Sequence, residues 1–258
     1  MLAKRIIAAL DIRDGRVVKG IRFERIQDVG DPLTQAMIYE EQGADEIVFL
    51  DIAASQENRN HRSELMAQVG RRLRIPFTVG GGITSVREMV QLVQSGADKV
   101  FVNTAAVDDP NLIREGALVI GSANLVVAID ARQIGDQWKV MIRGGHSETR
   151  WQLLDWCQYV QDAGAGEILL TSMGHDGTKK GYDLAMLTAV TNTVTIPVVA
   201  SGGAGRIEDF EALFQQTNAS GALAASIFHY GTIGIHHLKE ELHRRGIHVR
   251  MDKNNPMG

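Results

Sequence analysis

Two aspartates occupy matching positions in the two halves of this 258-residue sequence. Asp11 ends an apolar run within Ala9–Arg13, and Asp130 ends a similar run within Ala128–Arg132. Two carboxylates on opposite sides of a ligand can divide general acid and general base work between them. Each aspartate alone could equally be a strand-end residue that caps the following turn. Because the two recur as a pair, we favour a catalytic role for both.

Glycine turns are also duplicated. Gly80–Gly82 and Gly202–Gly203 each follow an apolar run and precede a helical pattern. The backbone N–H groups of such turns can approach an anion at a helix N-terminus. In each half the next apolar run leads into a hydroxyl residue, Thr104 or Ser226. Tight turns need glycine in any case, but the duplication and the hydroxyls together predict two phosphate sites and a substrate with two phosphates.

Four charged residues stand where apolar runs begin: Arg5, Glu46, Lys99 and Glu167. Since Arg5 and Asp11 are six residues apart, they share one face of a strand at a spacing of ~20 Å. We therefore expect the four charges to form a balanced ring at the opposite end of the strands from the aspartates. Charged plugs of this kind are commonly structural, and spacing alone does not decide between a structural and a functional ring.

Short apolar runs must position all these residues, and they alternate with amphipathic stretches along the chain. The runs are almost continuously hydrophobic, as strands buried on both faces of a parallel sheet are. Helical patterns lie between them; Asp31-Pro32 begins one and Gly43 ends it. Eight units of about 32 residues predict a (βα)8 barrel, with a doubly wound open sheet as the alternative. The expected strands are Arg5–Asp11, Glu46–Asp51, Pro76–Gly80, Lys99–Asn103, Leu125–Asp130, Glu167–Ser172, Pro197–Ser201 and Ala222–Ile227.

The chain also resembles itself at an offset of about 121 residues. Ile75–Gly82 reappears as Ile196–Gly203, and Gly43–Ile47 reappears as Gly164–Ile168. Matches in the same order as the two aspartates indicate a barrel of two fused half-barrels, each with four βα units. In such a barrel the aspartates face each other across the mouth.

Two segments are too long to be simple turns between a strand and a helix. Ile12–Gly30 is rich in charge and glycine and reads as a long loop. Ala131–Arg150 contains an alternating stretch followed by Gly144-Gly145, which predicts a small hairpin. Both follow the C-terminal end of an expected strand, where barrel active sites lie.

Composition excludes several classes of protein. The formal charge of −4 and the 44% of hydrophobic residues are ordinary for a globular protein and argue against a dedicated binder of nucleic acid or of anionic membranes. No run reaches ~18 apolar residues, as a membrane span would. The apolar start is interrupted at Asp11, where a signal peptide would continue. We expect a cytoplasmic protein with a single barrel domain over residues 1–250 and a frayed tail over 251–258.

No metal and no organic cofactor are expected. Cys157 is the only cysteine, so neither an internal disulfide nor a cysteine cluster for zinc can form. The histidines near the C-terminus lack acidic or cysteine partners at ligand spacing. Gly80–Gly82 is not followed by the acidic residue that completes a dinucleotide-binding fingerprint.

From Met1 to about Arg250 the sequence resembles one family, the cyclase subunit of imidazole glycerol phosphate synthase. The matching stretches cover nearly every expected strand: Leu10–Gly20, Phe77–Gly82, Asp98–Ala106, Gly164–Ser172, Asp176–Thr178, Ala200–Gly205 and Ala222–His229. The resemblance implies a (βα)8 barrel in which ammonia attacks a bis-phosphorylated ribulosyl-formimino aminoimidazole carboxamide ribonucleotide. The products are imidazole glycerol phosphate and aminoimidazole carboxamide ribonucleotide, so the reaction serves histidine biosynthesis and feeds purine biosynthesis.

The same resemblance implies roles for individual residues. Asp11 and Asp130 are the general acid/base pair, and Lys19, on the first loop, closes over the substrate and its phosphate. The implied phosphate-site residues are Gly82 and Thr104 at one site and Gly203 and Ser226 at the other. The remaining positions around the substrate mouth are Asn103, Thr171, Asp176, Gly177 and Ser201.

The ring of Arg5, Glu46, Lys99 and Glu167 matches the family's ammonia gate. Ammonia would come from a glutamine amidotransferase (glutaminase) subunit docked on the N-terminal face of the barrel, as a 1:1 heterodimer. Two departures from the family stand out: Ala8-Ala9 replaces the usual Pro-Cys, and Gly174-His175 replaces an acidic and basic pair. The first should affect packing only, whereas the second lies near the mouth and could alter affinity or loop closure.

Two other functions fit part of this pattern. A sister isomerase of the same pathway resembles the chain in fold, duplication, paired aspartates and phosphate sites, but the charge ring and the long first loop fit the cyclase better. A barrel that only binds and activates a glutaminase would not need both aspartates.

Overall fold

Eight parallel strands form a closed barrel in the computed structural model, which describes residues 2–21, 24–52 and 59–251. Around the barrel the order is β1, β4, β5, β6, β7, β10, β11 and β12, and β12 pairs again with β1. The two half-barrels meet where β6 pairs with β7 and where β12 pairs with β1, in both places in parallel. The strands are β1 (Arg5–Arg13), β4 (Glu46–Asp51), β5 (Phe77–Gly80), β6 (Lys99–Val102), β7 (Leu125–Ile134), β10 (Glu167–Ser172), β11 (Val198–Ser201) and β12 (Gly221–Ala224).

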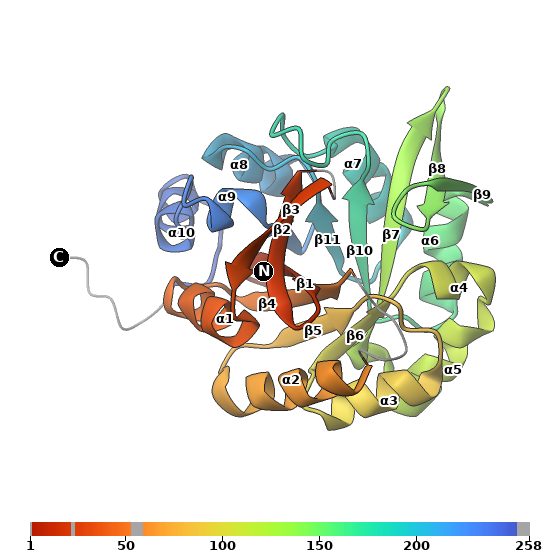
Figure 1. Cartoon of the computed structure of the whole chain (residues 1–258). Coiled ribbons are helices and arrows are strands. Elements are labelled where there is room, and N and C mark those ends of the chain that lie inside the picture. Colours follow the sequence, from red (N-terminus) through yellow and green to blue (C-terminus); the bar gives the residue numbers. More distant parts are fainter. Residues whose placement is uncertain (1, 22–23, 53–58, 252–258) are drawn as a thin grey trace.

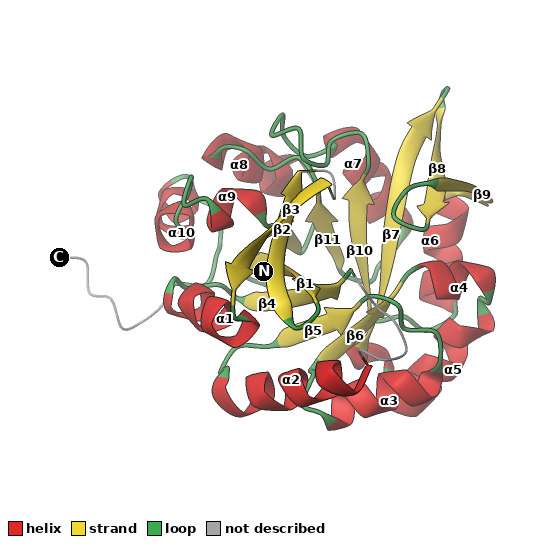
Figure 2. Ribbon diagram, in the orientation of Figure 1, coloured by secondary structure: helices red, strands yellow, loops and turns green. Residues whose placement is uncertain are grey.

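Helices connect the strands and surround the barrel (Figures 1 and 2). They are α1 (Pro32–Glu41), α2 (Arg59–Arg72), α3 (Val86–Gln94), α4 (Thr104–Asp108), α5 (Asn111–Ile120), α6 (Leu153–Asp162), α7 (Leu184–Thr193), α8 (Ile207–Gln216), α9 (Ser226–His229) and α10 (Ile235–Arg244), with a short 3₁₀ turn at Ser122–Asn124. The predicted (βα)8 barrel is confirmed, and the open sheet is wrong. Among the described helices, none is both long and apolar enough to cross a bilayer.

The alternation of side chains along each strand produces two separate apolar layers. In β1, Ile6, Ala8 and Leu10 belong to the large layer between the strands and the helices. Ile7 and Ala9 point the other way and belong to a small cluster inside the barrel. Because successive residues of a strand face opposite sides, Arg5 and Asp11 lie on the inner face, at its two ends.

Hydrogen bonds repeat between the half-barrels at the offset seen in the sequence. Glu40 Oε1 accepts from the backbone N–H groups of Arg74 and Ile75, at 2.6 and 3.0 Å. In the second half, Gln161 Oε1 accepts from those of Thr195 and Ile196, at 2.6 and 3.3 Å. The duplicated sequence therefore makes a duplicated structure, down to a side chain that ties a helix end to the start of the next strand.

The two long segments both contain strands. Ile12–Gly30, which we expected to be a loop, instead forms β2 (Arg16–Ile21) and β3 (Glu24–Gly30), an antiparallel hairpin continued from β1. The prediction was wrong because the high charge of this segment hid its alternation. The expected hairpin after β7 is present as β8 (Gln137–Ile142) and gains a third strand, β9 (Ser147–Gln152). The β7–β8 pair projects beyond the ring of helices, at the upper right of Figure 1.

Several strand boundaries differ from expectation by a few residues, and at one of them the predicted strand continues into a helix. The apolar stretch Ala222–Ile227 was expected to be a strand throughout, but β12 ends at Ala224 and α9 begins at Ser226. A continuous apolar run does not distinguish a buried strand from a buried helix. The consequence is that Ser226 starts a helix, as Thr104 does in the first half.

A buried ion pair fastens the last helix to the N-terminal ends of the strands. Lys239 of α10 donates from Nζ to Asp45 Oδ1 at 2.9 Å and to the carbonyl of Gly43 at 2.8 Å. Asp45 Oδ2 accepts from the backbone N–H of Ile6 at 2.8 Å. Both charged side chains are 5% exposed, so this buried pair joins α10 to β1 and to the start of β4.

Candidate active site

The two duplicated aspartates lie on opposite sides of the barrel. Asp11 is in β1 and Asp130 is in β7. These strands are separated by β4, β5 and β6 in one direction and by β12, β11 and β10 in the other. Both residues are half-buried near the C-terminal ends of their strands. The two carboxylates therefore flank the mouth of the barrel.

Asp130 has an environment that suits proton transfer. Burial raises its pKa to about 6; the nearby Asp176 adds to the rise, and a hydrogen bond from Asn103 opposes it. That bond joins Asn103 Nδ2 to Asp130 Oδ2 at 3.0 Å. A carboxyl with a pKa near neutrality can both give and take a proton at physiological pH. Asn103 Oδ1 is buried and accepts no hydrogen bond from the described residues, so it can accept one from a ligand.

Two of the predicted mouth residues lie on strands next to that of Asp130, and a third follows one of these strands. Thr171 of β10 is in register with Asp130 of β7 on one side and with Ser201 of β11 on the other. Asp176 follows β10 at the mouth, and the residue as a whole is exposed. Its carboxyl, however, is partly surrounded by protein atoms, and this desolvation raises its pKa. A hydrogen bond from the backbone N–H of Gly177 opposes this rise. The second half-barrel thus gathers polar groups around Asp130.

The first glycine turn follows β5 at the same end of the barrel. Gly81 and Gly82 have φ angles of 100° and 60°, which an L side chain rarely adopts. A Cβ on Gly81 would lie 2.1 Å from the carbonyl oxygen of Asp51, so the turn also needs glycine for close packing. Thr104 begins α4, and its hydroxyl accepts from the N–H of Arg143 at 3.0 Å. The hydroxyl hydrogen of Thr104 can still be donated to an anion.

The second glycine turn follows β11 and has the same backbone form. Gly202 and Gly203 have φ angles of 88° and 108°. A Cβ on Gly202 would lie 3.3 Å from the Cβ of Asp176, which places this turn beside the polar groups around Asp130. Ser226, in the next unit, is half-buried at the start of α9. Each half-barrel therefore presents a glycine turn and a hydroxyl at the mouth.

Lys19 lies in β2, where its backbone is in register with Gln27 of β3. Its side chain falls outside the part of the chain that the structure describes, so its predicted closure over a substrate stays a prediction. Residues 252–258 of the expected frayed tail are likewise outside the described residues.

The four predicted ring charges meet at the opposite end of the barrel. Arg5 Nη1 lies 2.9 Å from Glu46 Oε2, and Arg5 also pairs with Glu167. Lys99 Nζ lies 3.1 Å from Glu46 Oε2 and 2.7 Å from Glu167 Oε2. Two cations and two anions thus alternate in a closed, charge-balanced ring.

Within the ring, Arg5 and Glu167 keep their charges although both are largely buried. Burial opposes the charge of Arg5, but hydrogen bonding to Glu167 and its charge outweigh burial and raise the pKa of Arg5. Burial likewise favours neutral Glu167, but Arg5 and then Lys99 outweigh it and lower the pKa of Glu167. Arg5 and Glu167 are therefore both charged at neutral pH.

Two ring partners were missed in the sequence. Thr78 Oγ1 donates to Glu46 Oε1 at 2.6 Å, and Arg5 Nη2 donates to Ser220 Oγ at 3.0 Å. Thr78 could have been found, because it is a polar residue inside the apolar run of β5 and lies two residues before Gly80 on the inner face. Ser220 precedes β12 and carries no such signal.

The two departures from the family lie in different layers. Of the Ala8-Ala9 pair, Ala8 is fully buried in the layer under the helices, whereas Ala9 belongs to the cluster inside the barrel; that the change affects packing only stays a prediction. His175 lies near the mouth; its Nδ1 is 2.8 Å from the carbonyl of Gly181, and its Nε2 is 4.0 Å from Asp183 Oδ2. The imidazole is thus held within the loop between β10 and α7.

No set of three or more potential metal ligands occurs among the described residues.

Fold and site together define a duplicated (βα)8 barrel whose mouth combines opposed carboxylates with two glycine turns. A family model described as "Histidine biosynthesis protein" matches residues 5–234. The chain is 54% identical over 252 residues to the imidazole glycerol phosphate synthase subunit HisF of Thermococcus onnurineus and 56% identical to that of Thermococcus gammatolerans, covering 98% of this chain and 100% of each relative. Identity to the HisF subunit of Halalkalibacterium halodurans is 51%, over 97% of this chain and 100% of the relative. The chain belongs to the histidine biosynthesis protein family.

Proposed function

We propose that this chain is the cyclase subunit of imidazole glycerol phosphate synthase. It joins ammonia to the bis-phosphorylated ribulosyl-formimino aminoimidazole carboxamide ribonucleotide and releases imidazole glycerol phosphate, aminoimidazole carboxamide ribonucleotide and one molecule of water. The observation that carries this proposal is the full-length identity of more than half to relatives named as that subunit. The mouth supports it, because two anion-binding turns on opposite sides suit a substrate with a phosphate at each end.

The proposed chemistry uses the two aspartates as general acid and general base. Asp130, with its pKa of about 6, exchanges a proton with the substrate from one side, and Asp11 does so from the other. The turns at Gly82 and Gly203, each with its hydroxyl residue, hold the two phosphates. Asn103 orients Asp130 through the hydrogen bond described above.

We further propose a glutaminase subunit as the partner, docked as a 1:1 heterodimer on the end of the barrel that carries the charge ring. The relatives are themselves named as subunits, which supports a complex. In the proposed complex the ring of Arg5, Glu46, Lys99 and Glu167 is the entrance for ammonia. A cytoplasmic location fits this role.

The function is tested by supplying the ketose substrate with ammonium salts at alkaline pH. The expected result is formation of imidazole glycerol phosphate, detected by chromatography, without any partner protein. Interconversion of the aldose and ketose without ring closure would instead identify the sister isomerase. A chain that only stimulates a glutaminase and forms no product would identify a non-catalytic barrel.

The proposed gate predicts a split between two sources of nitrogen. In Glu167→Gln the ring loses one anion, so Arg5 and Lys99 retain only Glu46 as a charged partner. We expect glutamine-dependent product formation with the glutaminase subunit to fall by about tenfold, as ~1.4 kcal/mol on a barrier would cause, while ammonium-dependent formation stays near wild type. Glu148→Gln, an exposed change on β9, is the control. An equal loss with both nitrogen sources would show that the ring is only structural.

A further inference from the structure

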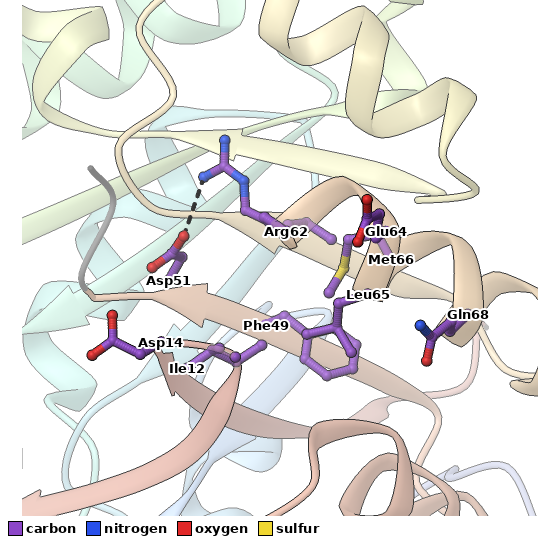
Figure 3. A pocket seen from close by; sticks show the side chains of 11 residues that line it. Ile12, Asp14, Phe49, Asp51, Arg62, Glu64, Leu65, Met66 and Gln68 are labelled. Atoms are coloured by element: carbon purple, nitrogen blue, oxygen red, sulfur yellow. Dashed lines mark ion pairs between the residues drawn. The ribbon is translucent and has the colours of Figure 1, made fainter. Parts of the chain in front are cut away.

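Arg62, in the first turn of α2, is a buried cation to which neither the sequence nor the relatives assign a role. Its side chain is 7% exposed and Nη1 lies 3.7 Å from Asp51 Oδ2, at the end of β4. The same Nη1 donates to the carbonyl oxygen of Gly81 at 2.6 Å. Figure 3 shows the guanidinium directed at Asp51, on the wall of a pocket of about 370 Å³. One side chain therefore joins α2, the end of β4 and the first glycine turn.

The bond to Gly81 fixes the direction of a backbone N–H. A trans peptide is planar, and its C=O and N–H point in opposite directions. Since the Gly81 carbonyl points to Arg62, the N–H of Gly82 in the same peptide points the other way. Gly82 is exposed at the mouth, so Arg62 holds this N–H in the orientation that an anion at the turn requires.

The corresponding turn of the second half-barrel is held differently. Asp183 occupies the position equivalent to Arg62, and Ser172 the position equivalent to Asp51, at the offset of the repeat. Ser172 Oγ donates to Asp183 Oδ2 at 3.0 Å, and a carboxylate cannot donate to a carbonyl. The backbone N–H of Gly181 donates to the carbonyl of Gly203 at 2.8 Å. Gly203 is the counterpart of Gly82, so this bond holds the next peptide along the turn and not the counterpart of the Gly81–Gly82 peptide.

We propose that Arg62 is a positioning residue for the first phosphate site, with no equivalent side chain at the second. The proposal rests on the phosphate role proposed above for the two turns. A charged donor in a buried setting makes a strong and directional hydrogen bond. Without it, the Gly81–Gly82 peptide is free to rotate, and phosphate affinity at that turn falls while the other turn is unaffected.

The test is a titration of the full chain with inorganic phosphate, followed by NMR at the Gly82 and Gly203 amides. In Arg62→Met we expect the Kd reported by Gly82 to rise about tenfold, corresponding to ~1.4 kcal/mol, and that reported by Gly203 to stay as in wild type. Arg62→Lys, which keeps the charge and a donor, should recover part of the affinity. With the ketose and ammonium salts, Arg62→Met should raise KM far more than it lowers kcat.

A control variant removes a buried cation at the other end of the barrel. Lys239→Met should lower the melting temperature yet leave both phosphate titrations unchanged. Equal weakening at both turns in Arg62→Met, no weakening at either, or no phosphate response at Gly82 in the wild type would each overturn the proposal. If the wild type binds phosphate but forms no product, the proposed function fails while the Gly82 titration still decides the role of Arg62.

Discussion

Replacing Asp130 by asparagine is expected to lower kcat by about 10²–10⁴-fold, the usual contribution of a positioned general acid or base, and also to stabilise the fold above pH 6. The loss of activity and the gain in stability both follow from the burial of the Asp130 carboxyl. The carboxyl is desolvated, which raises its pKa to about 6 and places it where a proton can be exchanged. The asparagine keeps the geometry, since its Oδ1 can accept the hydrogen bond from Asn103, but it can no longer transfer a proton.

The pH dependence of stability gives the sign of this second effect. The pKa of Asp130 rises from 3.8 when exposed to about 6 in the folded chain, so the folded state binds the proton more tightly than the unfolded state. The contribution of the Asp130 carboxyl to the free energy of unfolding is therefore fully present below pH 3.8 and is lost as the pH rises through 6. Asparagine does not titrate. The free energy of unfolding of Asp130→Asn should therefore exceed that of the wild type by an amount that grows between pH 3.8 and pH 6, to as much as ~3 kcal/mol.

Chemical denaturation from pH 4 to pH 8, with the ammonium-dependent assay in parallel, measures both effects. Asp136→Asn changes an exposed acid at the tip of the β7–β8 hairpin and should alter neither activity nor the pH profile. A variant Asp130→Asn with wild-type kcat would remove Asp130 from the proposed mechanism. A stability gain that does not depend on pH would show that its carboxyl is not desolvated as described.

The largest loss of stability is expected from Lys239→Met. This change leaves the buried carboxylate of Asp45 without its cation, and breaking a buried ion pair from one side costs ~3–5 kcal/mol. Urea denaturation should show the loss as a lower midpoint with an unchanged slope. The double variant Lys239→Met with Asp45→Asn should recover part of it, because the amide can still accept from the N–H of Ile6 and no charge remains buried.

Arg114→Met is the matched control for this prediction, since Arg114 is an exposed cation on α5. It should change the midpoint little, as surface substitutions usually do. A double variant as unstable as Lys239→Met alone would mean that the cost lies in the lost packing of the lysine stem and not in the uncompensated charge.

Local sequence patterns predicted the features that depend on periodicity. The apolar runs gave the eight barrel strands, and the repeat gave the two half-barrels, which the paired contacts of Glu40 and Gln161 confirm. Counting six residues from Arg5 to Asp11 also placed these side chains at the two ends of the inner face. The roles of the individual site residues stay predictions, although the structure brings most of them together at the mouth or in the ring.

Features that depend on contacts between distant residues were not predictable. Arg62 reaches Gly81 only because α2 packs beside the end of β4, and nothing in the local sequence of α2 indicates this. Ser220 joins the charge ring by a contact across more than two hundred residues. The β2–β3 hairpin was missed for another reason: its many charged residues do not produce the apolar alternation from which strands are recognised.

Between the charge ring and the mouth, the inner face of the described barrel carries nine buried apolar side chains, among them Ile7, Phe101 and Leu169. An ion that enters this layer loses its hydration and finds no counter-charge, at a cost of several kcal/mol. A neutral molecule as small as ammonia loses far less. The apolar interior of the barrel therefore opposes the passage of ions between the two polar ends. In the proposed reaction, nitrogen therefore crosses this layer as neutral ammonia and not as the ammonium ion.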